Sequence, residues 1–232
     1  MGDPDQYLPV VTSWRGEEAA PLLGSDLLYS MAGGTTIKLT VNRRSDPEIF
    51  GFLDRIVEET PIAELVKQAQ AQFSFEGPAD WELAISHAKR RKICLANNAR
   101  QRAAYTGEVL TIPTADVQGD REQTIDLFPG VMLQARVRLS KDGFVNGSFH
   151  EVVSTNPLQV KDVDDEQTRE VDPAWATEHL FLASCVTQSS VQGRTLRGRV
   201  RVHDCGHRHF THRSLRVCLS RAQHHACLDL RE

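Results

Sequence analysis

The chain has 232 residues, of which 40% are hydrophobic and 25% are charged, and its formal net charge is −4 at pH 7. This length allows one large or two small domains with a proper core. The slightly negative charge argues against a protein that coats nucleic acid through a general positive field. No apolar run approaches the roughly 20 residues that a membrane span needs.

The remaining bulk features point to an intracellular protein, nuclear or cytoplasmic, with no membrane partner. The N-terminus does not read as a signal or transit peptide. The five cysteines are odd in number and widely spaced, which favours reduced thiols in a reducing compartment.

Helical and strand patterns alternate along the first part of the chain. A short helix is expected over 26–31 after Ser25, and a strand over 36–41. Asp46 and Pro47 predict the start of a helix, as cap and first helical residue. Apolar spacing and flanking signals then predict three further elements, which are a helix over 61–72, a strand over 83–85 and a basic helix over 87–105.

Strand patterns dominate the rest of the chain. Alternation over 131–160 predicts strands, with Asn146-Gly147 as a strong hairpin signal. Four more strands are expected, at 180–185, 198–202, 215–219 and 226–230. Strands that alternate with helices indicate a parallel sheet flanked by helices, interrupted here by a β-rich insert.

Two segments in the last third are the most informative. The polar turn at 189–196 contains Gln192, Gly193 and Thr195, and the apolar segment 215–219 ends in Ser220-Arg221. Together they resemble motifs V and VI of the superfamily 1 DNA helicases, in particular the RecD-like branch.

Further segments resemble other parts of the same family, in the family's order. Residues 2–10 resemble motif III and residues 39–45 resemble motif IV. Residues 83–90 resemble the strand and helix start of a DNA-contacting segment, and 143–147 resemble the hairpin of a small inserted β-barrel. The ordered set covers nearly the whole chain.

The resemblance implies an α/β, RecA-like fold of the P-loop NTPase type, with a small inserted β-barrel. Residues 1–24 would be the end of a first motor domain and a linker. Residues 25–107 with 179–232 would form the second RecA-like helicase domain, and 108–178 the inserted β-rich subdomain.

The resemblance also implies roles for individual residues. Gln6 would sense the γ-phosphate of ATP, and Arg44 and Gly193 would help to bind the nucleotide. Arg221 would be an arginine finger, a group that contributes ~10³–10⁵ in rate in related enzymes. A guanidinium suits phosphate because it presents a planar fork of donors. The implied DNA contacts are Ser86, His87, Ser189, Gln192 and Thr195.

The sequence contains no G-x-x-x-x-G-K-[ST] loop, and no strand ending in Asp-Glu precedes Gly2. A site for ATP with Mg²⁺ would therefore be completed by a missing N-terminal RecA-like domain, in cis or in trans, and the chain alone is expected to be inactive. Single-stranded DNA would be its other partner. The chain departs from the family where Ser189-Ser190 replace the usual His-Lys and where Arg216 replaces an aromatic residue.

Other interpretations stay open. The chain would alternatively be a non-catalytic remnant that binds nucleic acid or protein. A zinc site from Cys205 and His207 with His224 or Cys227 is conceivable, but no Cys-x-x-Cys pair supports it, and no metal site is predicted. Two sets of side chains each have two possible roles. Packing against other side chains or stacking on DNA bases is possible for Trp14, Trp81 and Trp175. A solvated helix face or contact with the DNA backbone is possible for Lys89, Arg90, Arg91 and Lys92.

Overall fold

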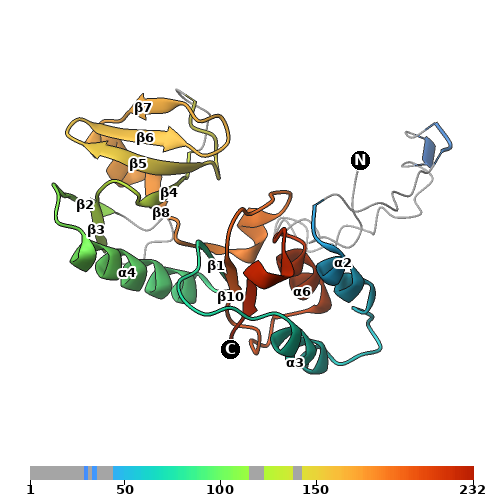
Figure 1. The fold of residues 1–232 in the computed structure, drawn as a ribbon. Coiled ribbons are helices and arrows are strands. Elements are labelled where there is room, and N and C mark those ends of the chain that lie inside the picture. The colour runs from blue at the N-terminus through green and yellow to red at the C-terminus, as the bar shows by residue number, and fades with distance from the viewer. Residues whose placement is uncertain (1–28, 31–32, 36–43, 115–122, 138–142) are drawn as a thin grey trace. The chain divides into compact units, whose positions relative to one another are not determined.

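The computed structural model describes residues 29–30, 33–35, 44–114, 123–137 and 143–232 (Figure 1). The expected strand at 36–41 and most of the helix at 26–31 lie outside the described residues, although Tyr29 and Ser30 are helical. The chain forms two compact units, which we call the terminal unit (Met1–Ala79 with Val191–Glu232) and the central unit (Asp80–Ser190).

The helices α2 and α3 of the terminal unit begin within one residue of where the sequence predicts. The α2 helix (Pro47–Asp54) starts after Asp46, whose side chain accepts a hydrogen bond from the Ile49 amide at 3.0 Å. The α3 helix (Ile62–Gln72) follows Pro61. Phe52 on α2 packs edge-on against Phe73 after α3, with ring centroids 5.2 Å apart, so the two helices share a core.

Two parallel strands form the sheet of the terminal unit. The β10 strand (Val200–Val202) pairs with β11 (Leu228–Leu230), and the α6 helix (His212–Leu219) and the short η2 helix (His225–Cys227) lie between them in the chain. The apolar side chains of both strands are buried. Both strands lie within ranges that the sequence predicts as strands, 198–202 and 226–230, and each is two residues shorter than predicted.

The strand predicted over 215–219 is wrong, because these residues form α6. Thr211 caps this helix by accepting a hydrogen bond from the Ser214 amide at 3.2 Å. Leu215, Cys218 and Leu219 are buried at helical spacing. A mainly apolar segment of five residues fits both the 3.6-residue repeat of a helix and the two-residue repeat of a strand. The cap at Thr211 is the signal that distinguishes helix from strand here.

The central unit contains a second parallel pair. The β1 strand (Trp81–Ala84) pairs with β9 (Cys185–Thr187), with Leu83 opposite Val186. The α4 helix (His87–Ala104) follows β1 as predicted. The single strand predicted over 180–185 is instead two strands, β8 (Leu180–Leu182) and β9, which belong to different sheets.

The β-rich part of the central unit is antiparallel (Figure 1). Among the described residues, five strands pair in the order β7-β6-β5-β4-β8, and β2 pairs with β3. Gly147 has a φ of 87°, and its amide donates to the Ala135 carbonyl at 2.8 Å, so Asn146-Gly147 turns the chain into β5. The remaining bounds are β2 (Leu110–Thr114), β3 (Gln123–Leu127), β4 (Met132–Ala135), β5 (Phe149–Thr155), β6 (Leu158–Asp162), β7 (Thr168–Glu170) and α5 (Pro173–His179).

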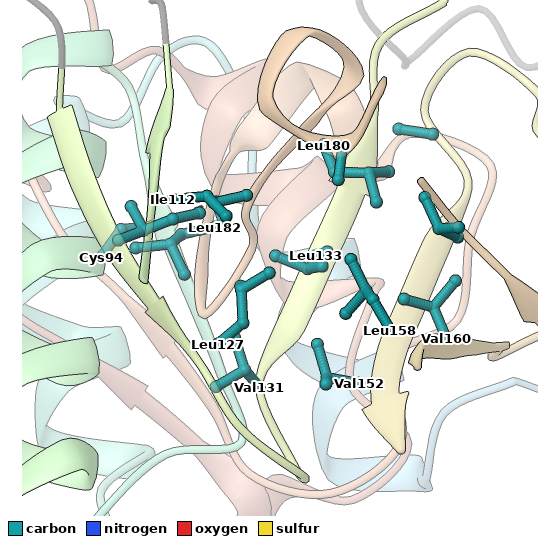
Figure 2. Close-up of a cluster of buried hydrophobic side chains, with 14 of the residues drawn as sticks. Cys94, Ile112, Leu127, Val131, Leu133, Val152, Leu158, Val160, Leu180 and Leu182 are labelled. Carbon is teal, nitrogen blue, oxygen red and sulfur yellow. Dashed lines mark hydrogen bonds between the residues drawn. The ribbon is translucent and has the colours of Figure 1, made fainter. Parts of the chain in front are cut away.

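One hydrophobic core joins these strands to α4. Figure 2 shows side chains of the sheet, including Leu133 and Leu180, close to Ile112 of β2 and Cys94 of α4. The Cys94 thiol donates to the Cys185 carbonyl at 3.1 Å, and burial raises its pKa. The core of the central unit therefore includes residues from the segment 108–178 and from the chain on either side of it.

Candidate functional site

Arg221 lies in the turn directly after α6, and its side chain is only 1% exposed. Its Nε donates to the Val217 carbonyl at 3.0 Å, and its Nη2 donates to the Ser220 hydroxyl at 2.8 Å. Its Nη1 donates to the carbonyls of Arg194 at 2.9 Å and Val191 at 3.5 Å. The guanidinium is thus held by backbone oxygens and a hydroxyl of its own unit.

The turn at Gly193 both accepts a hydrogen bond from Arg221 and donates one to it. Gly193 has a φ of 84°, a left-handed conformation that favours glycine, and no atom lies within 4 Å of an added Cβ. The Leu196 amide donates to the Arg221 carbonyl at 2.9 Å. Gln192 is half-buried and Thr195 is exposed. The structure therefore brings together the segments that resemble motifs V and VI.

Arg44 precedes α2 and is exposed, and its chain neighbours contact the segment after Arg221. The Ser45 hydroxyl donates to the Ala222 carbonyl at 3.0 Å. The Asp46 amide donates to the Gln223 carbonyl at 2.9 Å. The described part of the motif IV-like segment is thus joined to the motif VI-like segment. Gln6 lies outside the described residues.

Asp46 makes further contacts in the same place. Its Oδ2 accepts hydrogen bonds from the His225 amide at 2.7 Å and from His225 Nδ1 at 2.8 Å. Burial raises the pKa of Asp46, but the bonds from His225 and Ile49 outweigh it and leave the pKa lowered. The carboxylate therefore joins the start of α2 to the chain before β11.

Ser86 caps α4, with its hydroxyl accepting a hydrogen bond from the Lys89 amide at 3.1 Å. His87, the first residue of the helix, is exposed. The N-terminus of a helix carries a partial positive charge and attracts anions such as phosphate. This end of α4 thus combines an exposed histidine with a partial positive charge of the helix backbone that attracts anions.

Ser189 lies in the 3₁₀ helix η1 (Gln188–Val191) and is exposed. Its hydroxyl lies 3.3 Å from that of Thr187. The neighbouring Ser190 hydroxyl donates to the Thr187 carbonyl at 2.7 Å. Ser189 therefore presents a hydroxyl to solvent while Ser190 holds the backbone.

The prediction that Arg90 is a solvated or DNA-contacting surface residue is wrong, because its side chain is only 5% exposed. Its Nε is buried and makes no hydrogen bond. Arg90 lies one helical turn before Cys94, and Asn97 and Asn98 continue the same buried face. Asn97 donates to Glu82 at 3.1 Å. The spacing to Cys94 and the asparagines is the signal that would have placed Arg90 inside.

The two described tryptophans are packed against other rings. Trp81 meets Phe149 edge-on, with centroids 5.0 Å apart. Trp175 lies 4.7 Å from the rings of Phe144 and His179. Ring packing, one of the two predicted roles, is therefore confirmed for both, and Trp14 lies outside the described residues.

Three side chains among the described residues could hold a metal ion together. The group whose ligand atoms lie within 4.8 Å of one another is Asp46, Glu48 and His225. Cys205 and His207, the conceivable zinc ligands, do not belong to such a group within the described part of the chain. Burial raises the pKa of Cys205 to about 12, so this thiol is protonated at neutral pH.

Comparisons with known proteins identify the fold. No family model and no curated protein matches the chain. A structure of two coordinating Pif1 helicases at forked double-stranded DNA matches with a TM-score of 0.60 and 17% identity, covering 82% of this chain and 48% of that one. Bacteroides Pif1 bound to single-stranded DNA matches with a TM-score of 0.57 and 17% identity, covering 82% and 50%. Pif1 helicase from Candida albicans matches with a TM-score of 0.51 and 17% identity, covering 80% of this chain and 53% of that one.

The chain thus spans about half the length of these Pif1 helicases, which belong to superfamily 1. At this identity the likeness shows the fold. The predicted α/β, RecA-like fold with parallel strands and flanking helices is confirmed, and the likeness is to Pif1 rather than specifically to the RecD-like branch. Within the described residues, no helix is both long and apolar enough to cross a membrane.

Proposed function

We propose that this chain is part of an ATP-dependent DNA helicase motor. The observation that carries the proposal is the meeting of three motif-like segments in the terminal unit. Arg221 bonds to the turn at Gly193, and Ser45, next to Arg44, bonds to Ala222, next to Arg221. In a helicase fold these segments would form one face of a nucleotide site.

The nucleotide would be ATP with Mg²⁺, bound between this chain and a first RecA-like domain supplied in cis or in trans. Pif1 from Bacteroides has been solved with ADP-AlF3 and single-stranded DNA, and its structure matches this chain with a TM-score of 0.59. Arg44, which is exposed, would supply positive charge to the phosphates, and Gly193 would allow close backbone approach. Arg221, whose side chain is 1% exposed, would reach a phosphate only by giving up some of its hydrogen bonds to the Arg194 and Val217 carbonyls. Gln6 would sense the γ-phosphate.

The DNA contacts would be made mainly to phosphate. His87 and the α4 N-terminus would bind one phosphate, with Ser86 holding the helix start. Ser189, Gln192 and Thr195 would donate to others through hydroxyl and amide groups. Phosphate contacts give binding that weakens with salt and carries little sequence preference. The resemblance of the ordered segments to the RecD-like branch extends the proposal to 5′-to-3′ movement along DNA. The widely spaced cysteines favour an intracellular compartment.

The test is ATP hydrolysis and single-stranded DNA binding by the purified chain. The proposal expects DNA binding that weakens as KCl rises, with no ATP turnover by the chain alone, since its sequence lacks the phosphate loop. Turnover by the chain alone that is lost in Arg221→Lys would contradict the view that a second domain completes the site. Absence of DNA binding at low salt would contradict the DNA role.

A second candidate is a binding module without catalysis. It is favoured by one observation, the burial of the Arg221 guanidinium and its hydrogen bonds to backbone oxygens of the same unit. Addition of a first RecA-like domain from a Pif1 helicase distinguishes the two. The motor proposal expects DNA-stimulated hydrolysis in the mixture, whereas the binding-module alternative expects DNA binding alone.

A further inference from the structure

The central unit contains a groove that none of the proposed helicase residues lines. Its volume is ≈ 580 Å³, and it is bounded by the start of β2, the β5–β6 turn and the start of α5. Leu158 and Val171 are buried at its floor, with Leu110 half-buried beside them. This volume is typical of grooves that hold a small ligand or a few side chains.

Carboxylates line the rim of this groove. Glu108, Glu170 and Asp172 are exposed there, and no Lys, Arg or His is among the lining residues. Asp172 caps α5 by accepting from the Ala174 amide at 2.8 Å. Glu108 and Glu170 take part in no ion pair within the described part of the chain. The groove therefore repels phosphate and attracts cationic groups.

The backbone beside the groove is extended and lies at sheet edges. In the described sheets, β7 pairs with β6 and ends the five-stranded order, and β2 pairs with β3. Edge strands are places where an extended peptide aligns, with alternate side chains entering pockets. An apolar side chain of such a peptide would enter the floor while its neighbours reached the rim.

We propose that this acidic groove binds an extended segment of a partner protein in which lysine or arginine flanks an apolar residue. Charge complementarity selects this occupant, because three carboxylates line the groove together with apolar side chains, and no Lys, Arg or His is among the lining residues. The proposal is independent of the helicase role. It assigns a protein-binding surface to the same unit that carries the basic α4 helix.

The experiment is a titration of the ¹⁵N-labelled full chain with a capped seven-residue peptide in which lysine alternates with valine. The expected result is saturable shifts of the Leu110, Leu158 and Val171 amides. Glu108→Gln combined with Glu170→Gln should weaken binding roughly 2- to 30-fold, as expected for the loss of two exposed charge pairs. The spectrum itself shows whether the variant is folded.

Two controls sharpen the test. Glu151→Gln removes an exposed carboxylate of β5 outside the groove and should leave the affinity unchanged. A peptide with glutamate in place of lysine should not bind. The proposal would be overturned by shifts outside the groove, by equal loss in the Glu151 control, or by no binding at millimolar peptide.

Discussion

The guanidinium of Arg221 donates a hydrogen bond of 2.9 Å to the carbonyl oxygen of Arg194. In return, the Arg221 carbonyl accepts a hydrogen bond from the Leu196 amide at 2.9 Å. The turn after α6 and the turn at Gly193 are therefore a single hydrogen-bonded structure. If Arg221 binds phosphate, the same residue also stabilises the terminal unit through these hydrogen bonds.

Replacing Arg221 by alanine should destabilise the terminal unit. The change removes the Arg221 donors of the Arg194 and Val217 carbonyls, of which Val217 keeps the Ser220 hydroxyl as a donor at 3.0 Å. Loss of such hydrogen bonds costs roughly 1–3 kcal/mol. Urea unfolding followed by circular dichroism measures the change in the free energy of unfolding. Arg213→Ala, on the same helix α6, is the control and should change it little. Equal stability of the Arg221 variant and the wild type would contradict the structural role.

Gly193→Ala should destabilise the chain by about 1–2 kcal/mol, because an L residue at this positive φ is strained. Crowding is not the cause, since nothing lies within 4 Å of the added Cβ. Gly206→Ala is a matched control, with equally open space and no positive φ. Thermal melts of the two variants compare them directly. A similar effect of both changes would show that the left-handed turn is not what matters.

Asp46→Ala should also lower stability, by roughly 0.5–2 kcal/mol, because Asp46 caps α2 and accepts two hydrogen bonds from His225. The lowered pKa of Asp46 gives the sign of the pH effect. Its stabilisation is present above the unfolded-state pKa near 3.8 and disappears as pH falls through the lower folded-state pKa. Chemical denaturation at pH 7 and pH 3 should therefore show a smaller difference between wild type and variant at pH 3.

His150 should make the central unit less stable in mild acid. It is fully buried, its Nε2 lies 2.7 Å from the Ser148 hydroxyl and its Nδ1 lies 3.6 Å from Asp162. Burial lowers the pKa of His150, with the attraction of Asp162 opposing the shift and the charge of Arg169 adding to it.

The unfolded chain therefore takes up a proton below about pH 6.5 that the folded chain resists, and stability falls as pH decreases, by at most about 1.4 kcal/mol per pH unit. His150→Gln stays neutral, so its melting temperature should fall less than that of the wild type between pH 7.5 and pH 5.5. Parallel pH dependence of the two proteins would contradict this assignment.

Local signals in the sequence predicted the starts of α2 and α4 well, whereas α5 was not predicted and α6 was predicted as a strand. Asp46-Pro47 and Ser86 place the first residues of α2 and α4, because capping depends on neighbours within one helical turn. Two of the failures concern a short segment and a buried charged side chain. The run 215–219 is too short for its period to be read, and Arg90 is buried by packing that its charge does not reveal.

In the candidate site, too, some features follow from the local sequence and others depend on contacts between distant segments. The left-handed turn at Gly193 follows from the sequence around it. The bond from Ser45 to Ala222 spans 177 residues, and no local pattern encodes it. Motif order placed these segments in one domain, whereas the burial of the Arg221 guanidinium depends on carbonyls that only the folded chain brings together.

The most direct test of the helicase proposal is binding of a fluorescein-labelled oligo(dT) to the chain, followed by anisotropy at several KCl concentrations. His87→Glu adds negative charge at the exposed start of α4, a position where an acidic residue favours the helix, so a change in binding would not reflect unfolding. Ala99→Glu adds the same charge at an exposed position farther along α4. We predict salt-sensitive binding that His87→Glu weakens by roughly threefold or more and Ala99→Glu leaves nearly unchanged. No binding at low salt, or equal weakening by both variants, would contradict the account.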